Sequence, residues 1–108
     1  LEAWPGVPVG NEEGEIITAA LGDKRAILLS HHGQLSTGAS IEEACVIAQL
    51  IERAAKLQLL AMSAGTVKPI LPELGREAHD WISKPKRHGA AFNYYARQNL
   101  RKHADCLN

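Results

Sequence analysis

The sequence carries no excess of charge of either sign, since twelve lysines and arginines balance twelve aspartates and glutamates. A chain without a net field has no long-range attraction to nucleic acid or to an anionic membrane surface. No apolar run approaches the length of a membrane span, and no signal-peptide pattern opens the chain. We therefore expect no nucleic acid and no membrane among its partners.

Cysteine is scarce as well. Cys45 falls within an apolar helical pattern and Cys106 within the terminal residues, so neither suggests a disulfide scaffold. We expect two free thiols in a reducing compartment, which points to a cytoplasmic protein. The 108 residues fit one small domain. The chain opens on Leu1 and continues through a proline-rich stretch, residues 4–8, so we expect a piece of something larger.

The features that are present are organised around one short stretch. The apolar run Ala26–Leu29 is bounded by turn-forming residues, which predicts a buried strand. His31 and His32 follow where this strand ends. A polar loop comes next, flanked by Gly33 and Gly38, and its glycines are typical of a turn that requires positive φ.

The longest helical pattern follows this loop. Ser40 and Glu43 form an S-x-x-E capping box, which predicts a helix from Ile41 to about Ala64 with Gly65 as its stop. Apolar residues cover so much of this helix that we expect two packing partners, a sheet on one side and another helix or subunit on the other. Shorter helices are predicted over residues 12–21, capped by Asn11 and ended by Gly22, over residues 73–83 and over residues 86–103.

The imidazoles are the first candidates for chemistry. A site with three imidazoles and one open position can hold zinc and polarise a substrate carbonyl. His31 and His32 leave a strand on opposite sides, so one could reach a metal while the other packs or hydrogen-bonds. The remaining histidines are His79, His88 and His103. Because none of them forms an H-x-H or H-x-x-x-H arrangement, a structural or surface role for the pair is as well supported as metal binding.

Half of the basic residues gather between Lys84 and Lys102, close to Phe92, Tyr94 and Tyr95. Basic residues interleaved with aromatics raise the alternative of a helical nucleic-acid binder, but the balanced overall charge favours a solvated helix face. Either tyrosine could serve as an acid in an active site, although a core or interface position is the commoner role.

A family resemblance rests on a combined pattern. The pattern consists of Ala26-Ile-Leu-Leu-Ser-His-His-Gly33, then Gly38, then Ile41-Glu-Glu-Ala44 at the start of an alanine-rich helix with Glu52. It resembles the C-terminal half of a class II aldolase/adducin domain and covers about Val9 to Gly65. The resemblance implies an α/β fold, with residues 1–108 as a partial domain: the C-terminal segment of a three-layer α/β/α sandwich, mainly helical, with at least one core strand.

The resemblance also implies a divalent metal ion. In the enzymes of this family the histidine directly before the glycine is the third metal ligand, so His32 is the expected ligand and His31 a neighbour that does not bind. Zinc is the expected ion, with manganese or another divalent ion as alternatives. The other two ligands form an H-x-H motif earlier in the family's chain, near an acid/base carboxylate. Neither feature occurs here, so no catalytic residue is identified.

The implied activity is that of a lyase, which cleaves a C–C bond of a sugar phosphate or related hydroxy-ketone through a metal-stabilised enediolate. Relatives epimerise or decarboxylate. The implied partners are the missing N-terminal half of the domain, a small-molecule substrate and the other subunits of a homo-tetramer. This piece alone is expected to be inactive. The alternative is a non-catalytic adducin-like module that uses the same fold for assembly or protein binding.

Overall fold

The computed structural model describes residues 10–107, in which helices predominate over a small sheet. The elements are α1 (Glu12–Leu21), β1 (Ala26–Leu29), β2 (Gly33–Ser36), α2 (Ile41–Ala64), α3 (Pro72–Ile82), α4 (Pro85–Lys102) and a 3₁₀ helix, Ala104–Leu107. The expectations for residues 4–8 and for the side chain of Cys106 lie outside the described part of the structure. Within that part, no helix has the length and apolar character needed to cross a membrane.

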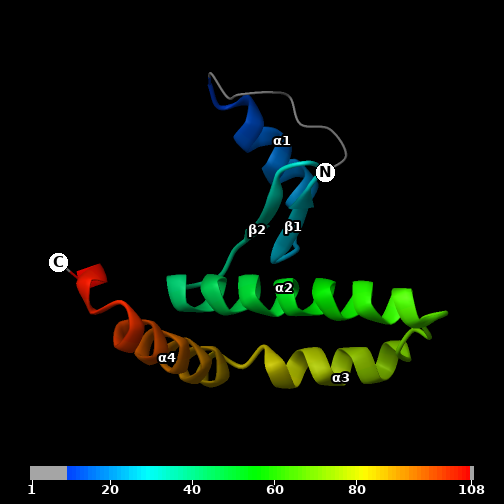
Figure 1. The fold of residues 1–108 in the computed structure, drawn as a ribbon. Coiled ribbons are helices and arrows are strands. Elements are labelled where there is room, and N and C mark those ends of the chain that lie inside the picture. The colour runs from blue at the N-terminus through cyan, green and yellow to red at the C-terminus, as the bar shows by residue number, and fades with distance from the viewer. Residues whose placement is uncertain (1–9, 108) are drawn as a thin grey trace.

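Helix α2 runs through the middle of the molecule (Figure 1). The β1–β2 hairpin stands on one side of it, with α1 beyond the hairpin, and α3 and α4 follow its other side. The hairpin contacts α2 through β2, and α4 packs on α2 as well. The expectation that this helix packs on two sides is therefore confirmed. The mostly helical chain with its antiparallel hairpin is compatible with a piece of an α/β fold.

The capping box fixes the start of α2. The Ser40 hydroxyl accepts a hydrogen bond from the Glu43 backbone N–H at 3.2 Å, as the S-x-x-E pattern predicts. In a capping box the glutamate side chain usually accepts from the N–H of the N-cap residue, here Ser40. In this structure Oε2 of Glu43 accepts instead from the preceding N–H, that of Ala39, at 2.6 Å. The helix begins at Ile41 and ends before Gly65, so both predicted ends are confirmed.

Two of the shorter helices, α3 and α4, begin at prolines, and α1 ends at a glycine. Pro72 and Pro85 occupy the first turns of α3 and α4, where a missing N–H costs nothing. Gly22 ends α1 with φ 55° and donates its N–H to the Thr18 carbonyl at 3.0 Å. The predicted cap at Asn11 is wrong: its backbone is already helical, and its side chain makes no capping bond.

The segment expected to be a polar loop, residues 33–38, is mostly the second strand of the hairpin. Strand β2 pairs antiparallel with β1 along all of its residues. Its polar side chains bond to α2, with Gln34 Nε2 donating to the Ala48 carbonyl at 3.2 Å and Ser36 Oγ to the Ala44 carbonyl at 2.9 Å. The polar residues that predicted a loop therefore fasten a strand to a helix.

The two glycines of this segment have different roles. Gly33 has φ 151°, so it provides the positive φ expected of a turn glycine. Gly38 is required by a close approach: a Cβ there would lie 2.8 Å from the Ala44 backbone nitrogen and 2.9 Å from the Glu43 Cβ. Because glycine has no side chain, the segment that joins β2 to α2 can pass this close to the first turn of the helix.

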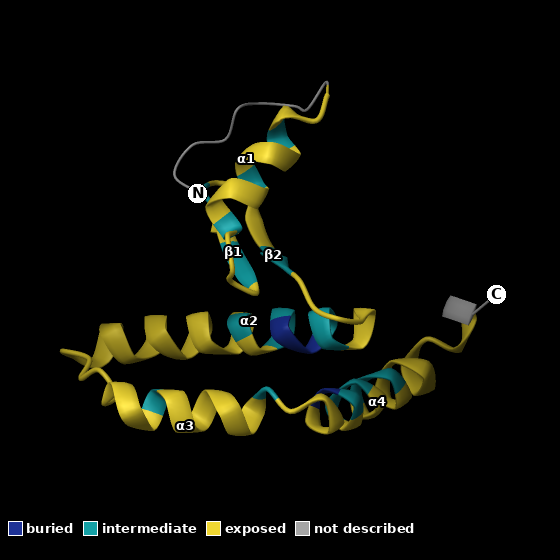
Figure 2. Ribbon diagram, turned by 180° about the vertical axis from the view of Figure 1, so that it is seen from behind, coloured by how far each residue is buried: buried dark blue, intermediate teal, exposed yellow. Residues whose placement is uncertain are grey.

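The buried apolar core of the described residues is small. Val46 and Ile47 are the buried apolar side chains, and they account for the dark blue stretch of α2 in Figure 2. Strand β1 is half-buried rather than buried, since Leu28 is 61% exposed. Large apolar side chains remain on the surface, among them Ile41, Leu57, Leu59, Leu60, Met62 and Ile70. The chain thus presents more apolar surface than its own elements cover.

Candidate functional site

The two adjacent histidines lie in the turn of the hairpin. The His32 backbone N–H donates to the Leu29 carbonyl at 3.1 Å, which closes a tight turn. His31 has φ 58°, a left-handed backbone conformation that is uncommon for residues other than glycine. Histidine adopts it more often than most other residues do. With Gly33 also at positive φ, His32 is held between two residues of unusual backbone conformation.

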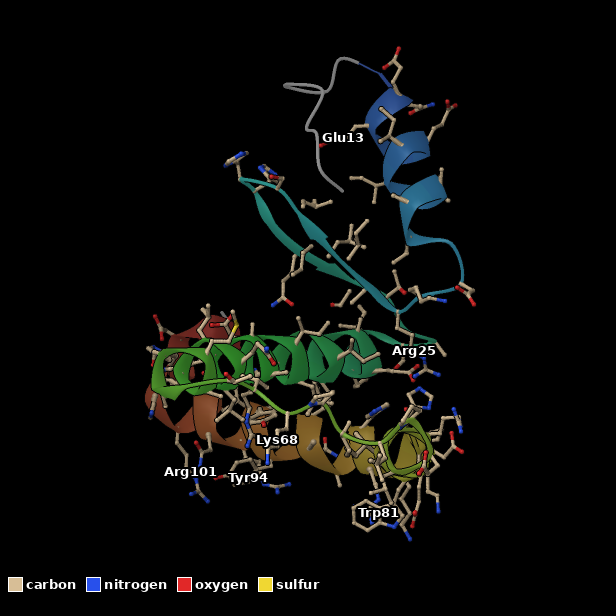
Figure 3. The ribbon with its side chains drawn as sticks, turned by 90° about the vertical axis from the view of Figure 1, so that its right-hand side faces the viewer. Glu13, Arg25, Lys68, Trp81, Tyr94 and Arg101 are labelled. Carbon is tan, nitrogen blue, oxygen red and sulfur yellow. The ribbon has the colours of Figure 1, made fainter. Side chains whose placement is uncertain are left out.

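This turn projects away from the helices. Both histidine side chains are exposed, and the tip of the hairpin stands clear of α2 and α4 (Figure 3). The other histidines belong to α3, α4 and the C-cap of α4. Among residues 10–107 no three histidine, cysteine, aspartate or glutamate side chains are grouped closely enough to hold a metal ion. The described residues therefore do not assemble a three-imidazole site.

A cluster of polar side chains centres on Glu43 instead. Its Oε1 accepts from Arg25 Nη1 at 2.6 Å and lies 3.3 Å from Nδ1 of His88, while Oε2 bonds to the Ala39 N–H. Arg25 directly precedes β1, and His88 lies in the first turn of α4. One carboxylate thus joins the base of the hairpin, the start of α2 and the start of α4.

These contacts favour the charged form of Glu43. The Ala39 N–H has the largest effect and lowers the pKa of the carboxyl below the ordinary glutamate value of 4.5, against the opposing effect of burial. The nearby charges of Arg25 and His88 lower this pKa further. Hydrogen bonds to the charged form, rather than ion pairing alone, keep the carboxylate ionised.

Replacing Glu43 with glutamine is expected to reduce the loss of unfolding free energy that occurs as the pH is lowered. Because the pKa is lower in the folded than in the unfolded chain, the carboxylate stabilises the fold above the usual glutamate range, and this contribution disappears as pH falls through the folded pKa. Urea unfolding from neutral pH to about pH 3 should show a steeper loss for wild type than for Glu43→Gln. The exposed Glu52→Gln change on α2 is the control and should keep the wild-type slope. Parallel profiles for wild type and Glu43→Gln would contradict this role.

Two grooves meet at His88. The larger has a volume of about 570 Å³, and its lining includes apolar residues of α2 together with the polar side chains of Arg25, His79 and His88. The smaller, about 410 Å³, lies at the start of α2 and α4 and is lined by Glu42, Glu43 and His88. Neither groove includes His31 or His32, so the hairpin turn and the Glu43 cluster are separate features.

The aromatic and basic residues of α4 make local contacts. Tyr94 and Tyr95 meet edge to face with ring centres 5.6 Å apart, and the exposed Tyr94 accepts a hydrogen bond from Gln98 at 2.7 Å. Arg87 lies over the Trp81 ring of α3. The prediction of a core position is therefore wrong for Tyr94, whose side chain is exposed. No described contact brings either tyrosine to the histidine turn.

The pairing of His88 with Glu43 is the feature that sequence reasoning missed. The capping pattern identified Glu43 only as a helix cap. A usable signal existed in α4, where His88, Phe92 and Tyr95 recur at helical spacing and share its less exposed side. That spacing identifies His88 as inward-facing, but it does not identify its partner on another helix.

Comparison with known proteins gives a family match. Residues 3–59 match the family model described as "Class II Aldolase and Adducin N-terminal domain". This stretch contains the hairpin, its histidine turn and most of α2.

Individual relatives are similar over parts of the chain. A "Putative aldolase class 2 protein" of Caulobacter vibrioides is 36% identical over 75 residues, which are 68% of this chain and 29% of the relative. The "Meiotically up-regulated gene 14 protein" of Schizosaccharomyces pombe is 38% identical over 56 residues, 52% of this chain and 22% of the relative. A "Rhamnulose-1-phosphate aldolase" of Listeria monocytogenes is 31% identical over 67 residues, 62% of this chain and 24% of the relative. The chain thus matches less than a third of each relative's length.

Proposed function

Because the chain belongs to the class II aldolase and adducin family, we propose that it is part of a divalent-metal-dependent aldolase-like lyase. In this proposal His32 is one metal ligand and His31 is a neighbour that does not bind. The observation that carries the proposal is the family match across the hairpin, combined with an imidazole displayed on an exposed, backbone-constrained turn.

Residues 10–107 do not by themselves complete a metal site. The described residues offer no group of three donors, so we derive no catalytic step from them. We propose that the remaining ligands and the acid/base carboxylate come from another part of the protein, which meets the projecting turn. Bound there, a divalent ion would act as a Lewis acid on substrate oxygens. Zinc is the proposed ion because an imidazole nitrogen is one of its preferred donors.

The chain is proposed to be the C-terminal half of the family domain, within a three-layer α/β/α sandwich. The exposed apolar side chains of α2, such as Leu57 and Leu60, support this, because a complete small domain would cover most of them. The half-buried hairpin supports it too, since a two-stranded sheet is marginal without further strands or packing. The missing half of the domain and the other subunits of a homo-tetramer are the proposed occupants of these surfaces.

The proposed substrate is a sugar phosphate or a related hydroxy-ketone, cleaved at a C–C bond. The name of the rhamnulose-1-phosphate aldolase relative supports this substrate class. The alternative is a non-catalytic adducin-like module for assembly or protein binding, which would need no three-donor group.

An activity assay separates the two. The whole protein, stripped of metal with a chelator and reloaded with zinc, should cleave one or more ketose 1-phosphates only in its reloaded state. Release of the aldehyde product, followed by a coupled dehydrogenase, measures this. Protein reloaded with calcium is the control, because a hard ion that prefers oxygen ligands is a poor match for imidazole. A metal-loaded protein that is inert toward the whole panel would contradict the lyase and favour the module.

A further inference from the structure

Helix α4 carries cations on the side opposite its packed face. His88 is buried and Phe92 is half-buried, so these two residues mark the side of α4 that turns inward. Steps of roughly 100° per residue place Lys86, Arg97 and Arg101 within about 60° of one another on the opposite side. All three side chains are exposed, and α4 contains no aspartate or glutamate. We call these three residues the basic face of α4.

This basic face lacks a carboxylate partner within the described chain. The ion pairs among residues 10–107 involve none of its three cations. The neighbouring Tyr94 is 52% exposed, and Arg87 extends the positive surface to the exposed Trp81 ring of α3. Arginine, tyrosine and tryptophan are the residue types most enriched at the energetic centres of protein interfaces. The composition of this surface is therefore typical of a site that binds another protein surface.

The complementary charge of this chain lies in α1. Its first turn carries Glu12, Glu13 and Glu15, and the whole helix contains no lysine or arginine. A hollow of about 820 Å³ beside this turn is lined by Glu13 and Glu15, with Asn11 and Thr18 as further polar residues. We call the three glutamates the acidic turn of α1. A hollow lined by carboxylates fits a convex helix that displays cations.

The two charged surfaces cannot meet within one chain. Helix α1 lies beyond the hairpin on one side of α2, and α4 lies on the other side (Figure 1). Figure 3 shows Glu13 and Arg101 at opposite ends of the molecule, with the hairpin and α2 between them. The net charge of zero gives no long-range attraction to nucleic acid, whereas a second copy offers the matching surface for each face.

We propose that the basic face of α4 in one copy docks on the acidic turn of α1 in a second copy, head to tail. Each such contact leaves one α1 and one α4 unpaired at the ends, so the contact repeats until a ring closes. The proposal rests on the proposed function only for the presence of further copies. It requires neither a bound metal nor lyase activity, so an inactive protein would leave it intact.

Charge reversal in the whole protein tests this contact. Arg97→Glu with Arg101→Glu reverses the basic face, and Glu12→Lys with Glu15→Lys reverses the acidic turn. Each pair places like charges opposite one another, so the dissociation constant of the assembly should rise at least about tenfold. Sedimentation velocity measures it, and circular dichroism checks that the helices remain. Lys68→Glu with Arg76→Glu reverses two exposed cations outside α4 and should leave the assembly unchanged.

Rescue separates a contact between copies from any other role of these residues. A one-to-one mixture of the two reversed proteins should assemble again, because every α1 then faces an α4 of opposite charge. A single chain with all four reversals should also assemble, whatever the number of subunits in the ring. Assembly that survives either reversal would overturn the proposal. Dissociation without rescue, or equal dissociation of the Lys68 and Arg76 control, would overturn it as well.

Discussion

Replacing His32 with alanine is expected to remove the divalent ion from the whole protein. Under the proposed function His32 is one of three protein ligands, and a site that loses one of three loses most of its affinity. Wild-type protein should carry about one ion per chain after purification, and His32→Ala well under a tenth of that. Elemental analysis of the purified proteins measures the difference.

The neighbouring histidine offers a matched control. His31→Asn removes an imidazole from the same turn but tolerates φ 58°, because asparagine adopts the left-handed conformation readily. It should retain the wild-type metal content. Equal metal in wild type and His32→Ala would refute the ligand assignment. Equal loss in both variants would mean that the shape of the turn, rather than the His32 imidazole, governs binding.

The second large effect concerns the small core. Ile47→Ala should lower the free energy of unfolding by about 3 kcal/mol, because it leaves a cavity where α2 packs and little other buried apolar surface exists to compensate. Urea denaturation followed by circular dichroism measures this change.

Leu59 on the same helix is the control for that change. Its side chain is 68% exposed, so Leu59→Ala should cost less than about 0.5 kcal/mol. If Leu59→Ala cost as much as Ile47→Ala, then Leu59 would be buried in the assembled protein. That result would support the proposal that another part of the protein covers this surface.

Local patterns predicted the helices well. The ends of α2 followed from the Ser40–Glu43 box and from Gly65, and the break between α3 and α4 followed from Pro85. These signals act over a few residues, since a cap or a proline determines which backbone N–H groups are bonded nearby. They were therefore visible without knowledge of the remaining chain.

Strand β2 was not predictable in the same way. Its residues, 33–36, are short, partly polar and begin with a glycine, all of which favour a loop. Their strand conformation comes from pairing with β1 and from the bonds that Gln34 and Ser36 make to α2. The Asn11 cap failed for a related reason, because side-chain identity alone does not specify the backbone conformation that capping requires.

The sequence by itself determined the helices and the glycine turn at Gly33. His32 as a metal ligand stays a prediction, made from its position before a glycine in a family pattern. The tertiary structure decided the rest. It placed the His31–His32 turn on a projecting hairpin away from the other histidines, and it buried His88 beside Glu43. Helical periodicity specifies which face of a helix turns inward, but not which residue of another helix it meets. That meeting depends on how α2 and α4 pack, which only the folded chain defines.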